Sequence, residues 1–139
     1  MKTVTGSVSV NSRGHCDIID ITGQVSEELK ASGLREGRIT VFVSGSTAAV
    51  TSIEYESGLL KDLPEVMEKI APEGPEYHHD ATWGDGNGYA HVRAALVGAS
   101  FSVPFSKGRL LLGTWQQIVV MDFDNRSRRR EIVVQLIGE

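Results

Sequence analysis

Three of the four histidines lie close together in the sequence, at positions 78, 79 and 91. His78 and His79 stand in a polar stretch, and His91 falls in the helix predicted to follow it. Neutral imidazole is a good zinc ligand, so a loop histidine and a helix histidine can converge on one metal ion. The spacing is not a diagnostic metal motif, because exposed loop histidines and one locally bonded helix histidine would give the same pattern.

A carboxylate and a pair of hydroxyls offer further chemistry. Glu54 ends a strand predicted over residues 48–55, and a carboxylate beside a histidine loop can act as a general base or metal ligand. A solvated strand end explains Glu54 equally well. Ser46 and Thr47 follow Gly45 at a strand break, where hydroxyls and backbone N–H groups could hold a phosphate. This segment lacks the lysine and the spacing of a P-loop.

Four arginines fall within five positions near the end of the sequence, at 126, 128, 129 and 130. Strand residues alternate between the two faces of a sheet, so Arg128 and Arg130 are predicted to point to the same side. They could form a solvated hairpin tip, or they could bind an anion or an acidic neighbour. Upstream, Trp115 and two glutamines interrupt a strand of Leu, Ile and Val, which indicates a lined cavity or a subunit contact.

The elements that position these residues follow from hydrophobic periodicity. Alternating or β-branched segments predict strands over residues 2–10, 16–21, 38–44, 48–55, 100–105, 109–122 and 129–137. Apolar residues at helical spacing predict helices over 22–32, 59–70 and 87–97. We expect the first two strands to form a hairpin, Pro64 to kink a helix or open a second one, and residues 72–88 to form a long loop. This order indicates an α+β fold dominated by antiparallel sheet.

Composition sets the class of protein. The 139 residues suit one domain, and 40% hydrophobic with 23% charged residues is an ordinary globular balance. A net charge of −4 argues against general nucleic-acid binding, and no apolar run is long enough to span a membrane. The single cysteine, Cys16, sits in an apolar strand, and we interpret it as a core residue. With no secretory pattern in residues 1–20, we expect a cytoplasmic protein.

Several short motifs together are typical of a known family. They are Gly45–Ala49 with Glu54, Tyr77–Asp80, Asn87 with Ala90–Arg93, Leu112–Gln116, Arg128 with Arg130, and the terminal Gly138–Glu139. On these motifs, nearly the whole chain resembles the YjbQ family, also called the secondary thiamine-phosphate synthase family. The resemblance implies a single YjbQ-like domain over residues 1–139, with a sandwich-like antiparallel core, two to four short helices and assembly as a homotrimer.

The resemblance also implies a histidine-lined pocket near a subunit boundary and a weak thiamine-phosphate synthase activity. In that reaction a thiazole phosphate attacks a pyrimidine carbinol diphosphate, and diphosphate is released. The partner would then be a small phosphorylated substrate, without nucleic acid or membrane. The rival interpretations are a non-catalytic trimeric protein that binds a metabolite or a metal, and an unidentified reaction in the same pocket.

The motifs assign roles to individual residues. His79 and His91 would be catalytic with Glu54, and His78 would join the two histidines around a divalent metal such as zinc or magnesium. Residues expected to bind substrate are Ser46, Thr47, Asp80, Asn87, Arg93, Gln116, Arg128 and Arg130. The chain departs from the family pattern at Gly45, where many members carry a histidine, and this removes one of three candidate metal ligands.

Overall fold

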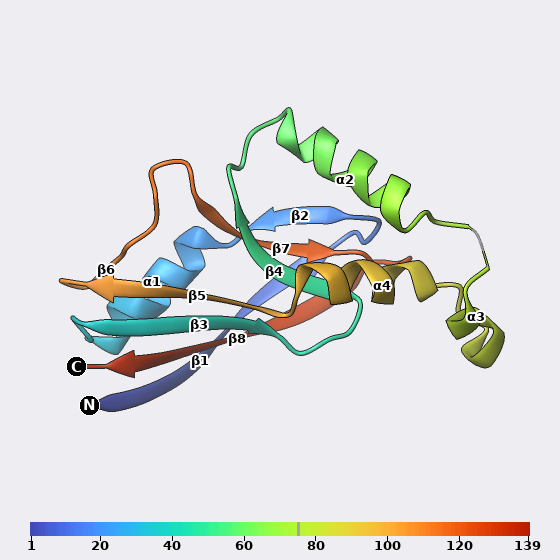
Figure 1. The fold of residues 1–139 in the computed structure, drawn as a ribbon. Helices are drawn as coiled ribbons and strands as arrows, with labels where there is room; N and C mark the ends of the chain where they lie inside the picture. Colours follow the sequence, from blue (N-terminus) through green and yellow to red (C-terminus); the bar gives the residue numbers. More distant parts are fainter. Residues whose placement is uncertain (75) are drawn as a thin grey trace.

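Two antiparallel β-sheets organise the computed structural model, which describes residues 1–74 and 76–139 (Figure 1). One sheet has the strand order β1-β8-β3-β5-β6, and the other has the order β2-β7-β4. The strands are β1 (Lys2–Ser12), β2 (Asp17–Asp20), β3 (Gly37–Val43), β4 (Ala48–Ile53), β5 (Ser100–Ser106), β6 (Arg109–Leu110), β7 (Gln117–Asp122) and β8 (Arg128–Gly138). The helices are α1 (Thr22–Ser32), α2 (Leu59–Ile70), α3 (His78–Trp83) and α4 (Gly88–Val97). The predicted α+β fold is confirmed.

The main core lies between the inner faces of the two sheets. Alternate residues of β8, Ile132, Val134 and Leu136, are fully buried there, as period-two strand geometry requires. Ile118 and Val120 of β7 face them from the second sheet, within the same hydrophobic cluster. Because both sheets contribute to one cluster, the sandwich-like arrangement expected from the sequence is present.

A second, smaller core covers the outer face of the three-stranded sheet. Val119 and Met121 of β7 point to this face, where Tyr89 and Ala90 of α4 pack with them. Helix α2 contributes its one buried residue, Met67, to the same cluster. This packing fixes α4 against the sheet and so determines where His91 lies.

The predicted hairpin of the first two strands is wrong. Strand β1 pairs with β8, whereas β2 pairs with β7 in the other sheet. The reason is a left-handed turn at Gly14, His15 and Cys16, whose φ angles are 73°, 53° and 66°. The N–H groups of His15 and Cys16 donate to the carbonyl oxygens of Asp124 and Asp122, at 2.8 Å each, and this redirects the chain into the second sheet.

Three local predictions also need correction. Helix α2 runs through Pro64 as one helix, so no second helix begins there. The loop predicted over 72–88, of which position 75 lies outside the described residues, contains the short helix α3. The long strand predicted over 109–122 is two strands, β6 and β7, joined by residues 111–116. Among the described residues, no helix is long and apolar enough to cross a membrane.

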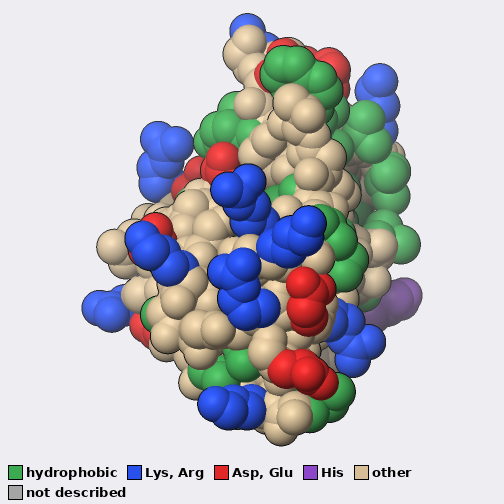
Figure 2. All heavy atoms as spheres, turned by 90° about the vertical axis from the view of Figure 1, so that its left-hand side faces the viewer, with side chains coloured by type: hydrophobic (Ala, Val, Ile, Leu, Met, Phe, Trp, Pro, Cys, Tyr) green, Lys and Arg blue, Asp and Glu red, His purple; other side chains and the backbone are tan. Residues whose placement is uncertain are grey.

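A group of exposed lysine and arginine side chains lies at the end of the molecule opposite to the histidine pair (Figure 1 and Figure 2). Both termini lie at one end of the ribbon, and α3 lies at the other (Figure 1). Lysine and arginine side chains gather on the end that holds the termini (Figure 2). Exposed basic residues near that end include Arg35, Arg38, Lys107 and Arg109. A chain of net negative charge therefore presents a basic face away from its histidine pair.

Candidate functional site

Helices α3 and α4 bring two histidines together. The rings of His79 and His91 lie with their centroids 4.2 Å apart and their planes tilted by 36°. Asp80 holds the two helices in this arrangement, because the first N–H of α4, at Gly88, donates to its Oδ1 at 2.9 Å. The convergence of a polar-stretch histidine with a helix histidine, predicted from the sequence, is present in the fold.

Two carboxylates flank one of these rings. His79 Nδ1 lies 3.4 Å from Asp80 Oδ1 and 3.7 Å from Asp85 Oδ1. The ligand atoms of these three residues all lie within 4.8 Å of one another, close enough to share a cation. His78, the other histidine of α3, is exposed and does not belong to this group.

Electrostatics favour the neutral form of His91 and the ionised form of Asp80. Burial lowers the pKa of His91, and the neighbouring His79 ring lowers it further. Burial acts to raise the pKa of Asp80, but the Gly88 N–H bond and His79 outweigh it, so this pKa is lowered. Near neutral pH the site therefore offers a neutral imidazole and an ionised carboxylate.

A hollow of about 320 Å³ opens beside His91. It is lined by Gly45, Ser46, Ala48, His91, Ala94, Ala95, Gly98 and Ala99. Small side chains on α4 and on the strand break leave this space free, so a ligand can approach the imidazole and the Ser46 hydroxyl together. The predicted substrate-binding residue Ser46 thus shares a surface with His91.

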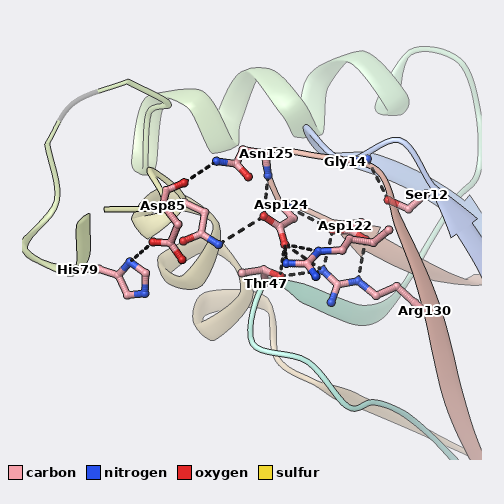
Figure 3. A network of polar contacts seen from close by, with 11 residues as sticks. Ser12, Gly14, Thr47, His79, Asp85, Asp122, Asp124, Asn125 and Arg130 are labelled. Atoms are coloured by element: carbon pink, nitrogen blue, oxygen red, sulfur yellow. Dashed lines mark hydrogen bonds and ion pairs between the residues drawn. The ribbon is translucent and has the colours of Figure 1, made fainter. Parts of the chain in front are cut away.

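A buried charge network adjoins this site (Figure 3), and in it Arg128 and Arg130 bind acidic neighbours, one of the alternatives that the sequence left open. Asp122 and Asp124 are fully buried, at 0% exposure. Arg130 binds Asp122 through two hydrogen bonds, Nε to Oδ2 at 2.8 Å and Nη2 to Oδ1 at 3.0 Å. Arg128 binds Asp124 Oδ2 through Nε at 2.8 Å and Nη2 at 2.7 Å. The sequence feature that could have predicted this network is the pair of aspartates two positions apart at the end of an apolar strand, because such residues share one face.

Thr47 and Asn87 link this network to the histidine helix. The Thr47 hydroxyl donates to Asp124 Oδ2 at 3.1 Å, and Asn87 Nδ2 donates to Asp124 Oδ1 at 3.4 Å. Asn87 is the residue that precedes α4, but its side chain makes no capping hydrogen bond to that helix. Its side chain is used to tie the start of α4 to Asp124.

Other predicted site residues lie elsewhere. Arg93 is buried on α4, where its Nε donates to the Ala71 carbonyl and its Nη2 to Glu68 Oε2, at 2.9 Å each. Glu54 lines a separate hollow of about 340 Å³ with Trp115, beyond the end of β4 that is remote from Thr47. Gln116 Nε2 donates to Ser52 Oγ at 3.0 Å. Within one chain, the structure therefore does not bring Glu54 together with the histidines.

Comparison with known proteins places the chain in a family. The family described as UPF0047 protein YjbQ-like matches residues 6–139. A UPF0047 protein of Archaeoglobus fulgidus is 43% identical over 120 residues, which cover 86% of this chain and 91% of the relative. A UPF0047 protein of Methanothermobacter thermautotrophicus is 37% identical over 139 residues, covering 100% of this chain and 95% of the relative.

Solved structures agree with these matches. A YbjQ-like protein of unknown function from Sulfolobus solfataricus superposes with a TM-score of 0.94 at 31% identity, covering 99% of each chain. An uncharacterised YjbQ/UPF0047 protein from Clostridium acetobutylicum gives a TM-score of 0.87 at 31% identity, covering 95% of this chain and 99% of that one. The resemblance inferred from the motifs is thereby confirmed, and the chain belongs to the YjbQ/UPF0047 family.

Proposed function

We propose that the protein binds a divalent metal at His79, Asp80 and Asp85 and a small phosphorylated substrate in the hollow beside His91. The observation that carries this proposal is the stacked pair His79 and His91, with both carboxylates within ligand distance of His79. Imidazole and hydroxyl donors on one open surface suit phosphate oxygens.

The donor set favours zinc among the divalent metals. It consists of one imidazole nitrogen and two carboxylate oxygens, the ligand types that zinc takes at sites with an open position. Magnesium prefers oxygen ligands in octahedral geometry, so the histidine counts against it. A zinc ion held here would polarise a phosphate oxygen of the bound substrate.

For the reaction, we propose the transfer that the family resemblance implies. The thiazole nitrogen forms a bond to the methylene carbon of the pyrimidine carbinol diphosphate while the carbon–oxygen bond breaks and diphosphate leaves with the electron pair. Such a departure requires stabilisation of developing negative charge more than a covalent nucleophile. His91 and Ser46 are placed to donate hydrogen bonds to that group.

One observation favours the non-catalytic alternative. The residues that line the hollow are mostly alanine and glycine, and none of them is a carboxylate. Glu54, the predicted general base, lines a different hollow. A surface without an acid–base carboxylate suits reversible binding of a metabolite, with any synthase activity incidental.

Two neighbouring histidines provide a matched test of the metal. Zinc binding by calorimetry should be lost in His79→Ala and kept in His78→Ala, because only His79 lies beside both carboxylates. Equal zinc affinity of these two variants would contradict the site. Formation of thiamine phosphate in a single turnover, with protein in excess over both substrates, would separate the enzyme from the binding protein.

We further propose that the protein assembles as a homotrimer. Two large apolar residues of the segment between β6 and β7 are exposed in the single chain, Trp115 at 73% and Leu111 at 56%. Exposed apolar groups of this size are typical of subunit contacts. Light scattering should give a trimeric mass that Trp115→Ala reduces and Ile70→Ala, another exposed apolar residue, preserves. A monomeric mass of the natural chain at micromolar concentration would contradict the trimer.

A further inference from the structure

The guanidinium of Arg130 forms hydrogen bonds through two of its three nitrogen atoms. Its Nε and Nη2 atoms donate to both oxygens of the buried Asp122 carboxylate, and Nη2 also donates to Thr47 Oγ1 at 2.7 Å. The side chain retains only 11% of its exposure. None of the described residues, 1–74 and 76–139, forms a hydrogen bond with the third nitrogen, Nη1. A guanidinium fixed along one edge therefore keeps two N–H donors on the other.

Gly45 is the residue that Nη1 approaches. A Cβ atom built on Gly45 would lie 2.8 Å from Nη1, closer than real Cβ contacts. Gly45 does not have a left-handed φ angle, so its backbone would accept any L-residue. A side chain at position 45 would therefore displace Arg130 Nη1 from its present place, although the conformation of the chain there would accept it.

The same glycine lines the hollow that contains His91. Gly45 therefore lies between the substrate hollow and the Arg130 guanidinium, and it has no side chain that would block the way between them. Next to it, Ser46 adds an exposed hydroxyl and backbone N–H on the same strand break. Charge-assisted hydrogen bonds from arginine are among the strongest that phosphate oxygens receive in proteins.

We propose that Arg130 Nη1, which lies against Gly45, binds a phosphate group of the ligand, and that the absence of a side chain at Gly45 lets the phosphate reach it. This inference rests on the proposed function, since it names where the phosphorylated ligand of that site is recognised. Asp122 then acts as a positioning residue, because its two hydrogen bonds orient the guanidinium without touching the ligand. The ligand class is a phosphate monoester or diphosphate of a small molecule.

The direct test is a single methyl group at position 45. Inorganic phosphate binding is measured by calorimetry on the natural chain, on Gly45→Ala and on Gly23→Ala. Gly23 is the matched control, because a Cβ there meets nothing within 4 Å and its φ is not left-handed. Gly45→Ala should weaken phosphate binding about tenfold or more by displacing Nη1, whereas Gly23→Ala should bind as the natural chain does.

A second readout follows Arg130 itself. The Nε–H resonance of Arg130 should shift on addition of phosphate in the natural chain and in Gly23→Ala, and it should stay unmoved in Gly45→Ala. If Gly45→Ala binds phosphate normally and His91→Ala does not bind it, phosphate binding by Arg130 is overturned while the proposed function stands. If the natural chain does not bind phosphate with or without bound metal, both the Arg130 proposal and the proposed function are overturned. Melting temperature reports whether each variant is folded.

Discussion

The histidine cluster and the arginine–aspartate network are neighbours across Asn87, yet they treat charge in opposite ways. In the network, Asp122 and Asp124 are fully buried and each binds an arginine at 2.7–3.0 Å. In the cluster, the side chains of His79, Asp80 and Asp85 are 27%, 20% and 53% exposed, and the two carboxylates lie 3.4 and 3.7 Å from His79 Nδ1.

The difference separates carboxylates that are paired inside the fold from carboxylates that lie on the surface. Buried charges are tolerated only when partners within the fold satisfy them, and the network meets that condition. The cluster keeps its ligand atoms on an accessible surface, which is the condition that a metal or substrate requires. Variants in the two regions should therefore fail in different ways.

The largest expected effect is on stability, in the network. Asp122→Ala would leave the guanidinium of Arg130 without its carboxylate in a mostly buried position. Removing one partner of a buried ion pair typically costs about 3–5 kcal/mol of unfolding free energy. Urea unfolding measures this loss, with Glu131→Ala as control, because the Glu131 pair with Arg129 is exposed. A loss in Asp122→Ala no greater than in Glu131→Ala would contradict the structural role of the network.

Acid should weaken the same network to a smaller extent. Burial acts to raise the pKa of Asp124, but hydrogen bonds from Asn125 N–H and Arg128 outweigh it, so the folded pKa lies below the ordinary value. A depressed carboxyl pKa stabilises the fold above the unfolded pKa, and this stability is lost as pH falls toward the folded value.

The measurement is unfolding free energy as a function of pH. Below about pH 4, near the ordinary aspartate pKa, the natural chain should lose stability more steeply than Asp124→Asn, which cannot titrate at that position. Parallel curves for the two proteins over this range would show that Asp124 does not contribute in this way.

The smallest expected effect on stability is in the cluster. His91→Ala should leave the ligand-free melting temperature unchanged or slightly raised, because alanine is a better helix former than histidine. Stabilisation by phosphate should disappear, because His91 lines the hollow proposed for the phosphorylated ligand. His15→Ala is the control, since His15 is exposed in the turn before β2 and contacts Glu73 instead.

An opposite pattern would identify His91 as a structural residue. A loss of about 1–3 kcal/mol in the ligand-free protein, as for an unpaired buried partner, together with a retained response to ligand, would contradict the comparison between the two regions. Differential scanning calorimetry of His91→Ala and His15→Ala, each with and without phosphate, makes this comparison.

Sequence patterns predicted the parts of this molecule that depend on local periodicity. His79 and His91 were predicted to converge because a helix follows a polar stretch, and local geometry is enough to bring them together. Strand positions such as β3 followed from alternation and β-branched residues, and helix positions such as α1 followed from apolar residues at helical spacing. Their roles as metal ligands and catalytic groups stay predictions.

Long-range pairing was not predictable from those patterns. The β1–β2 hairpin was wrong because a left-handed turn at His15 and Cys16, both unusual residues for positive φ, sends β2 to another sheet. Asp122 and Asp124 were not singled out because their partners, Arg130 and Arg128, are set by the contact of two sheets. Only the fold shows that these four charges cancel one another.

The place of β8 in its sheet also governs how the protein emerges during synthesis. Strand β8 lies between β1 and β3 and pairs with both, so that Lys2 is opposite Gly138. A nascent chain that has not reached Arg128 holds β1 and β3 with unpaired edges and an open inner face. Such edges are templates for wrong pairing, and contacts this distant in sequence form slowly. The growing chain therefore depends on β8 to close the sandwich, and it is exposed to aggregation until that strand has been made.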